Sequence, residues 1–249
     1  MPSYYCPELN QSKPIMGTRI SLAGSEAHHL IKVLHARAGD YIKLNSGSGI
    51  FAAAVITTLD KHIVEAELTS FESVKRSLPE YAIAFSLLKN KHDELLLEKC
   101  TELGASAFFP FTGVNSVRKG SENAIDRFEK IALAAIKQCD NPWLPKVSQA
   151  LPLKKALEKA IAEGFQPIIC SELRPQVWLH HLSFEEIGRP CFVIGPEGGF
   201  SIEEYRMFSG SAYQEISLGH LITRAETAAI AIAAQFNAYA NQGKTIGTT

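Results

Sequence analysis

The pattern of hydrophobic and polar positions changes character near residue 72. Before that point, short segments alternate between apolar and polar residues, as the strands of a small β-barrel do. The predicted strands span 18–22, 41–45 and 51–57, and the one predicted helix spans 25–34. A polar stretch, Glu72–Ser77, then marks the predicted boundary between a first domain, 1–72, and a second domain, 73–249.

After this boundary, strand patterns and helix patterns alternate, which is typical of a parallel sheet in an α/β fold. Strands are predicted at 81–88, 107–111, 166–170, 190–194 and 214–218. Helices are predicted at 92–103, 128–139 and 153–162, with two more beginning after Ser201 and Thr223. The pattern alone therefore predicts an α/β fold.

Two glycine-containing loops near the C-terminal end carry the strongest functional signal. Each follows an apolar run: one is Ile194–Ser201 and the other is Leu218–Ala228. Both should lie at the edge of the sheet where open α/β folds bind ligands, and glycine lets the backbone approach a ligand closely. Neither loop has the spacing of a phosphate-binding loop. We expect a small-molecule pocket, and purely structural turns are the alternative.

Each loop is also expected to begin a helix through a capping box, in which a hydroxyl and a carboxylate satisfy free backbone N–H groups. The two predicted pairs are Ser201 with Glu204, and Thr223 with Glu226.

The motifs in the two loops resemble those of one family. Gly195-Pro196-Glu197-Gly198-Gly199-Phe200, then Leu218-Gly219 and Arg224-Ala225-Glu226-Thr227-Ala228, is similar to the signature of the RsmE-type 16S ribosomal RNA uridine-N3 methyltransferases of the SPOUT superfamily. Supporting segments are His28-His29-Leu30, Lys32-Val33-Leu34, Gly39-Asp40, Lys99–Gly104, and Gln138 with Pro145. His35 and Asn141 stand where the family commonly has arginine, in regions expected to touch RNA.

The resemblance implies a SPOUT-type parallel sheet with a C-terminal trefoil knot, a small N-terminal PUA-like β-barrel that binds RNA, and a homodimer. It implies S-adenosylmethionine as the methyl donor and N3 of a uridine in 16S ribosomal RNA as the acceptor, on the assembled 30S subunit. Two alternatives stay open. One is a SPOUT ribose 2′-O-methyltransferase of ribosomal or transfer RNA, and the other is a non-catalytic RNA-binding or assembly protein.

The resemblance also suggests roles for individual residues. The expected cofactor-binding residues are Cys170, Ile194, Gly195, Glu197, Gly198, Gly199, Leu218, Gly219, Leu221, Ile222 and Thr223. The expected catalytic residues are Arg224 and Glu226, and the expected RNA-binding residues are His28, His29, Arg37, Lys89, Lys91 and Arg118, with Lys119 beside them.

Several of these residues have a simpler alternative. Arg224 would stabilise negative charge on a uracil oxygen or grip a phosphate, or else it is a surface arginine paired with Glu203 or Glu204. Glu226 is catalytic or only a capping residue. Glu197 faces the positive charge of the donor or only shapes a turn, and Cys170 lines the pocket or is a buried core thiol. For each basic RNA candidate, a solvated surface charge is the simpler alternative.

Composition narrows the class of protein. The chain has 249 residues, of which 46% are hydrophobic and 20% charged, as in ordinary globular proteins. No apolar run approaches the ~20 residues that span a bilayer, and no secretory signal is visible. Five cysteines without C-x-x-C spacing indicate reduced thiols, so we expect a cytoplasmic protein.

Charge and histidine spacing limit the partners. The net charge is −1, so binding to RNA would require a local basic patch rather than a global field. His28, His29 and His35, and the pair His180-His181, lack the spacing of known metal sites. We therefore expect no metal ion.

Overall fold

The structure is a computed structural model, and it describes residues 3–10, 14–76, 79–118, 124–173, 175–211 and 213–241. Contacts divide the chain into two compact units: Met1–Arg76 with Leu133–Leu144, and Ser77–Ala132 with Pro145–Thr249. The functional domain limits, 1–72 and 73–249, stay a prediction. Lys119 lies outside the described residues.

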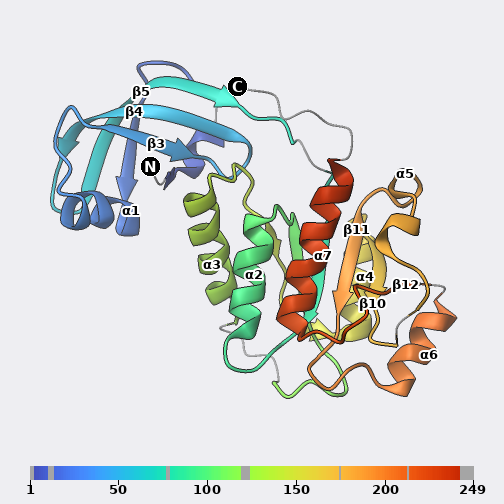
Figure 1. Cartoon of the computed structure of the whole chain (residues 1–249). Helices are drawn as coiled ribbons and strands as arrows, with labels where there is room; N and C mark the ends of the chain where they lie inside the picture. Colours follow the sequence, from blue (N-terminus) through green and yellow to red (C-terminus); the bar gives the residue numbers. More distant parts are fainter. Residues whose placement is uncertain are drawn as a thin grey trace. The chain divides into compact units, whose positions relative to one another are not determined.

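The first unit contains a five-stranded sheet in the order β1-β3-β4-β5-β2 (Figure 1). Its strands are β1 (Tyr4–Tyr5), β2 (Arg19–Ala23), β3 (Tyr41–Asn45), β4 (Ile50–Leu59) and β5 (Ile63–Ser73). All pairs are antiparallel except β1 with β3. Two register shifts in β4 bend the pairing with β5, as β-bulges do. The result is a curled sheet, although the sequence reading missed β5.

Alternation of buried and exposed positions along β2 and β5 gives the sheet one apolar face. That face is covered by η1 (Pro7–Asn10), α1 (Gly24–His28) and the π-helical turn η2 (His29–Val33). Of these, α1 and η2 occupy the region of the predicted helix. Ala27 and Leu30 are buried in the same core as Leu44 and Ile56.

Residues 133–144 join the first unit through backbone contacts with the turn after β3. Gly49 N–H donates to the carbonyl of Pro142 at 2.8 Å, and the Asn45 amide donates to the carbonyl of Asn141 at 2.9 Å. Gly49 has φ +92°, and a Cβ there would lie 2.3 Å from the Trp143 ring. Asn141 accepts from Trp143 N–H at 2.9 Å, so its side chain shapes this turn.

The second unit is built on a sheet in the order β12-β10-β11-β6-β7-β8, with β9 also pairing with β7. Its strands are β6 (Ala82–Ser86), β7 (Ala107–Thr112), β8 (Lys146–Val147), β9 (Leu151–Pro152), β10 (Gln166–Cys170), β11 (Pro190–Ile194) and β12 (Gln214–Ile216). Every pair is parallel. The predicted α/β class is confirmed; β12 ends two residues earlier than expected, and the short β8 and β9 were missed.

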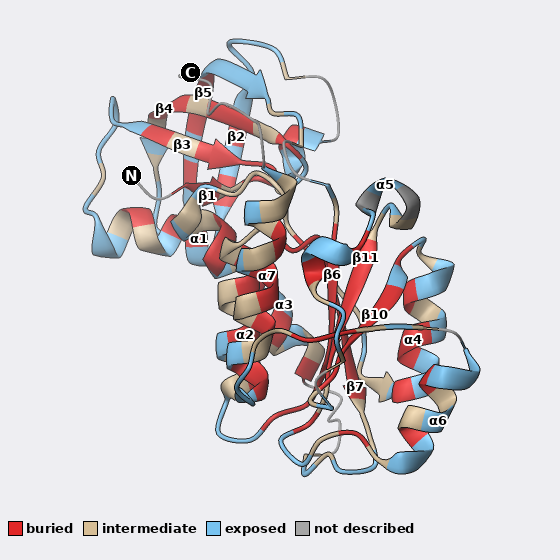
Figure 2. Cartoon of the chain, turned by 45° about the vertical axis from the view of Figure 1, so that its right-hand side comes forward, coloured by how far each residue is buried: buried red, intermediate tan, exposed pale blue. Residues whose placement is uncertain are grey.

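Helices cover both faces of this sheet. They are α2 (His92–Glu102), α3 (Ala124–Cys139), α4 (Leu153–Ala162), α5 (Phe184–Ile187), α6 (Ile202–Gly210) and α7 (Ala225–Ala240), and η3 (Leu179–His181) is a short 3₁₀ turn. Phe192 of β11 packs on Phe236 of α7, while Val193 lies in a core cluster with Leu157 of α4. Burial on both sides explains why these strands read as continuous apolar runs (Figure 2).

Residues 216–217 are held between the end of β10 and the segment that follows β10. Ser171 N–H donates to the Ile216 carbonyl at 3.0 Å, and Ser217 N–H donates to the Val177 carbonyl at 2.8 Å. Helix α7 then packs against β11, and its Tyr239 hydroxyl donates to the Leu182 carbonyl at 3.3 Å, in the same connection. These contacts agree with the expected C-terminal knot.

Candidate functional site

A cavity of about 580 Å³ opens at the carboxyl ends of four strands of the second unit. That size suits a small-molecule ligand. Its lining follows β6 (Lys89, Asn90, His92), β10 (Cys170, Ser171, Glu172), β11 (Ile194, Gly195, Pro196, Glu197, Gly199) and β12 (Ser217, Leu218, Gly219, Leu221, Ile222, Thr223, Arg224, Ala225, Glu226, Ala228). Both predicted loops therefore meet at one cavity, at the edge expected for parallel sheets.

The first loop depends on a glycine at position 199. Gly199 has φ +72°, and its N–H donates to the Pro196 carbonyl at 2.9 Å. A Cβ at this position would lie 2.4 Å from Oε1 of Glu172. The same carboxylate accepts from Phe200 N–H at 3.2 Å. Glu172 therefore holds the loop while lining the cavity.

The predicted capping box at Ser201 and Glu204 is confirmed. Ser201 N–H donates to the Glu204 carboxylate at 2.7 Å, and Glu204 N–H donates to the Ser201 hydroxyl at 3.2 Å. The other oxygen of Glu204 accepts from Val114 N–H at 3.0 Å. One buried carboxylate thus starts α6 and anchors the loop after β7.

The predicted capping box at Thr223 and Glu226 is wrong. Helix α7 begins one residue later than expected: its N-cap is Arg224, in an extended conformation and without a side-chain cap. Glu226 is consequently the second helical residue rather than the third. Its carboxylate lies 3.1 Å from Nδ1 of His92, at the start of α2.

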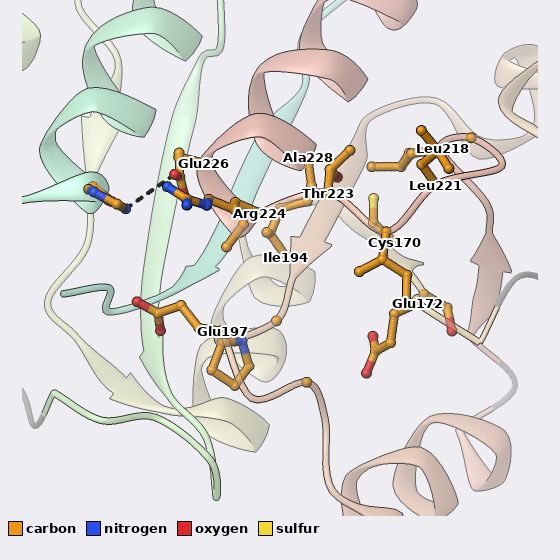
Figure 3. A pocket seen from close by; sticks show the side chains of 18 of the residues that line it. Cys170, Glu172, Ile194, Glu197, Leu218, Leu221, Thr223, Arg224, Glu226 and Ala228 are labelled. Carbon is orange, nitrogen blue, oxygen red and sulfur yellow. Dashed lines mark ion pairs between the residues drawn. The ribbon is translucent and has the colours of Figure 1, made fainter. Parts of the chain in front are cut away.

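Most of the labelled charged side chains lie on one side of the cavity. In Figure 3, Arg224 and Glu226 lie near Glu197, whereas Cys170, Leu218 and Leu221 lie on the opposite side. The Glu172 carboxylate also lies on the side with Cys170, so the two sides differ in how many charged groups they carry.

Arg224 is exposed at the cavity and takes part in none of the ion pairs found among the described residues. Glu204, one partner suggested for it, is instead held in the capping box of α6. Glu197 accepts from the backbone N–H of Lys89 at 3.0 Å. The carboxylate thus links the loops after β6 and β11.

Ten of the residues predicted to bind a cofactor line the cavity: Cys170, Ile194, Gly195, Glu197, Gly199, Leu218, Gly219, Leu221, Ile222 and Thr223. Gly198 does not, because it faces Asn115, whose amide donates to the Gly198 carbonyl at 3.3 Å. Burial raises the pKa of the Cys170 thiol, which keeps this side chain uncharged.

The predicted RNA-binding residues are spread over both units. His28 and Arg37 are exposed in the first unit, where Nδ1 of His29 lies 3.2 Å from the Tyr4 hydroxyl. In the second unit Lys89 lines the cavity and Lys91 is the exposed N-cap residue of α2. Their RNA-binding roles stay predictions.

Arg118 has a structural partner. Its guanidinium forms an ion pair with Asp93, a fully buried residue that also lies 3.9 Å from Arg127. Burial raises the pKa of the Asp93 carboxyl, against the opposing effect of the two arginines. Arg118 therefore compensates a buried charge, and its role at an RNA surface remains a prediction.

The sequence reading missed His92 and Asn115. His92 stands just after a predicted strand, a position that parallel-sheet topology places at the ligand edge. Asn115 holds the first loop from outside, and its amide also donates to the Gly199 carbonyl at 3.0 Å.

No cluster of three or more metal-ligating side chains is found in the part of the chain that the structure describes. Within those same residues, no helix is both long and apolar enough to cross a membrane.

Comparison with known proteins gives the class. The family described as "RNA methyltransferase domain" matches residues 76–237, and the family described as "RNA methyltransferase PUA domain" matches residues 22–69. The first match spans more than half of the chain, so the protein belongs to the RNA methyltransferase family, with an N-terminal PUA domain.

Relatives and solved structures agree with this assignment. Two proteins named Ribosomal RNA small subunit methyltransferase E are similar to the chain. The one from Synechocystis sp. is 29% identical over 228 residues, 90% of this chain and 74% of the relative. The one from Bacillus subtilis is 28% identical over 234 residues, 90% of this chain and 91% of the relative. A crystal structure of the Neisseria gonorrhoeae protein of that name, bound to S-adenosyl methionine, matches with a TM-score of 0.84 and 26% identity, covering 96% of this chain and 98% of that chain.

The links made by Glu204 give a testable prediction. Glu204→Ala removes the acceptor of two backbone N–H groups, and leaving such groups unpaired costs about 1–3 kcal/mol each. We expect the free energy of unfolding, measured by urea denaturation, to fall by about 2–4 kcal/mol. Glu203→Ala, at the exposed neighbouring position of the same first turn, is the matched control and should change it by less than about 0.5 kcal/mol. Equal effects of the two variants would contradict the role of Glu204.

Proposed function

We propose that the protein transfers a methyl group from S-adenosylmethionine to N3 of a uridine in 16S ribosomal RNA. The observation that carries this proposal is the single cavity formed by two glycine loops in a chain of the RNA methyltransferase family. Similar proteins named small subunit methyltransferase E support the choice of small-subunit ribosomal RNA.

The cavity suits the proposed donor. When bound, S-adenosylmethionine supplies an electrophilic methyl group on a positively charged sulfur. Three carboxylates line the cavity, from Glu172, Glu197 and Glu226, and they favour a cationic ligand. The side with Cys170, Leu218 and Leu221 offers apolar contact to an adenine ring, and the glycines admit it close to the backbone.

The acceptor atom sets the task of the protein. N3 of uracil carries a proton, and its lone pair is delocalised, so the neutral base is a poor nucleophile. The enzyme must align N3 with the methyl carbon and favour loss of the proton. Alignment lowers the activation barrier by on the order of 7–11 kcal/mol in favourable cases. A positioned base increases the rate by about 10²–10⁴-fold.

Arg224 is the proposed electrostatic catalyst. Its side chain stands at the charged side of the cavity without an ion-pair partner among the described residues. A guanidinium there stabilises the negative charge that develops on O2 or O4 of uracil as N3 loses its proton. Glu226 lies beside it on α7.

The remaining parts of the proposal concern RNA and assembly. The PUA domain, residues 1–72, binds RNA with His28, His29 and Arg37, while residues 73–249 form the methyltransferase domain, where Lys89, Lys91 and Arg118 face RNA. The substrate is the 30S subunit, and the enzyme acts as a homodimer in the cytoplasm.

The first test identifies the product. Labelled methyl groups from S-adenosylmethionine should transfer to unmodified 30S subunits, and nucleoside analysis should give N3-methyluridine. Free ribosomal RNA and transfer RNA are parallel substrates. A 2′-O-methylated nucleoside would show the alternative ribose methyltransferase. Donor binding without transfer to any of these RNAs would favour a non-catalytic binder.

The second test addresses Arg224. Arg224→Ala should lower kcat by about 10²–10³-fold, the range for one lost transition-state donor. Donor affinity, measured by calorimetry, should change little because the guanidinium acts on the acceptor. Arg206→Ala, on exposed α6 and outside the cavity, is the control and should match the wild type. Equal loss of donor affinity and kcat would contradict this role.

A further inference from the structure

Capping of helix α7 does not explain the contact between His92 and Glu226. Helix α7 starts at an N-cap without a side-chain hydrogen bond, so the Glu226 carboxylate is not used for capping. Glu226 is only 7% exposed, and its Oε1 lies 3.1 Å from Nδ1 of His92. Its Oε2 is buried and accepts no hydrogen bond from any described residue.

A buried carboxylate is costly unless a cation or donors compensate its charge. His92 is the side chain at ion-pair distance from Glu226, and both residues line the cavity (dashed line in Figure 3). The side chain of His92 is 33% exposed, so the imidazole is open to the cavity while one of its nitrogens is held.

The contact also favours one tautomer of His92. A carboxylate can only accept a hydrogen bond, so the Glu226 carboxylate at 3.1 Å from Nδ1 favours the tautomer with the proton on Nδ1. In the neutral ring Nε2 then has a free lone pair. This is the arrangement by which a buried carboxylate orients a histidine base and stabilises its protonated form.

Resting on the proposed function, we propose that His92 is the base that removes the N3 proton of the target uridine, and that Glu226 is its positioning residue. The N3–H bond breaks and the proton passes to Nε2 of His92. The N3 electron pair forms the bond to the methyl carbon as the carbon–sulfur bond breaks, and that bond's electrons remain on sulfur. The imidazolium, paired with Glu226, later releases its proton to water.

The surrounding charges suit this step. The charged groups that share the cavity with His92 are Lys89, Glu172, Glu197, Arg224 and Glu226. The neighbouring Asp93 is turned into the protein, where Arg118 and Arg127 compensate it. Arg224 stabilises the uracil anion, while Glu226 stabilises the imidazolium, so each charge created by the proton transfer has a counter-charge at hand.

The test compares His92→Gln with the wild type, once the wild type is shown to form N3-methyluridine on 30S subunits. We expect kcat to fall by about 10²–10⁴-fold, with KM for the subunit and calorimetric donor affinity within about twofold. The deficit should narrow as pH rises, because hydroxide removes the N3 proton more readily. Added imidazole should partly restore the rate of His92→Ala. His62→Gln, at an exposed turn of the first unit, is the matched control.

Glu226→Gln separates the two roles. It should lower kcat at least tenfold, and His92→Gln with Glu226→Gln should be no slower than His92→Gln alone, since residues that act as a unit are not additive. Three results would overturn the proposal: His92→Gln with normal kcat, a deficit that does not change with pH, or Glu226→Gln inactive while His92→Gln stays active. A wild type that forms no N3-methyluridine would instead count against the proposed function.

Discussion

The site depends on how the chain passes the end of β10. Backbone hydrogen bonds hold residues 216–217 between Ser171, at the end of that strand, and Val177, in the connection that follows. This fixes where the loop after β12 begins, so residues 218–224 must cross the carboxyl ends of β10 and β11 before α7 packs on β11. Because backbone bonds make this connection, the loop is positioned without contributions from its exposed Leu221 and Ile222 side chains.

The cavity built in this way is asymmetric in charge. One side offers Cys170, kept as a thiol by burial, with Leu218, Leu221 and the Glu172 carboxylate. The other offers more charged groups, namely Glu197, Arg224 and the His92–Glu226 pair. A methyl donor with an adenine at one end and a cationic sulfur near the other matches that asymmetry. In the proposed mechanism, the proton transfer takes place on the side where α2 and α7 begin, and these helices pack on each other.

Strong, local patterns were readable from the sequence. The predicted bounds match the observed ones for the buried strands 190–194 and 166–170 and for the helix 153–162. Burial on both faces and helical periodicity leave clear patterns in the sequence. The Ser201–Glu204 capping box was readable for the same reason. The prediction of a Thr223–Glu226 capping box was wrong because the Glu226 carboxylate contacts His92, a residue distant in the sequence.

Features that depend on contacts between distant segments could not be predicted from the sequence. Nothing local in residues 133–144 indicates that they pack with the first unit through Gly49 and Trp143. The role of Glu172 in holding Gly199, and of Asn115 in holding Gly198, likewise joins segments far apart in the sequence.

Hydrogen exchange with and without S-adenosylmethionine tests the central claim, that both loops form one donor site. The amides of residues 195–200 and 218–224 should become protected together on addition of the donor, while the turn at residues 46–50 should not change. Protection of one loop without the other, or protection confined to residues outside both, would contradict a single site at the carboxyl ends of β10, β11 and β12.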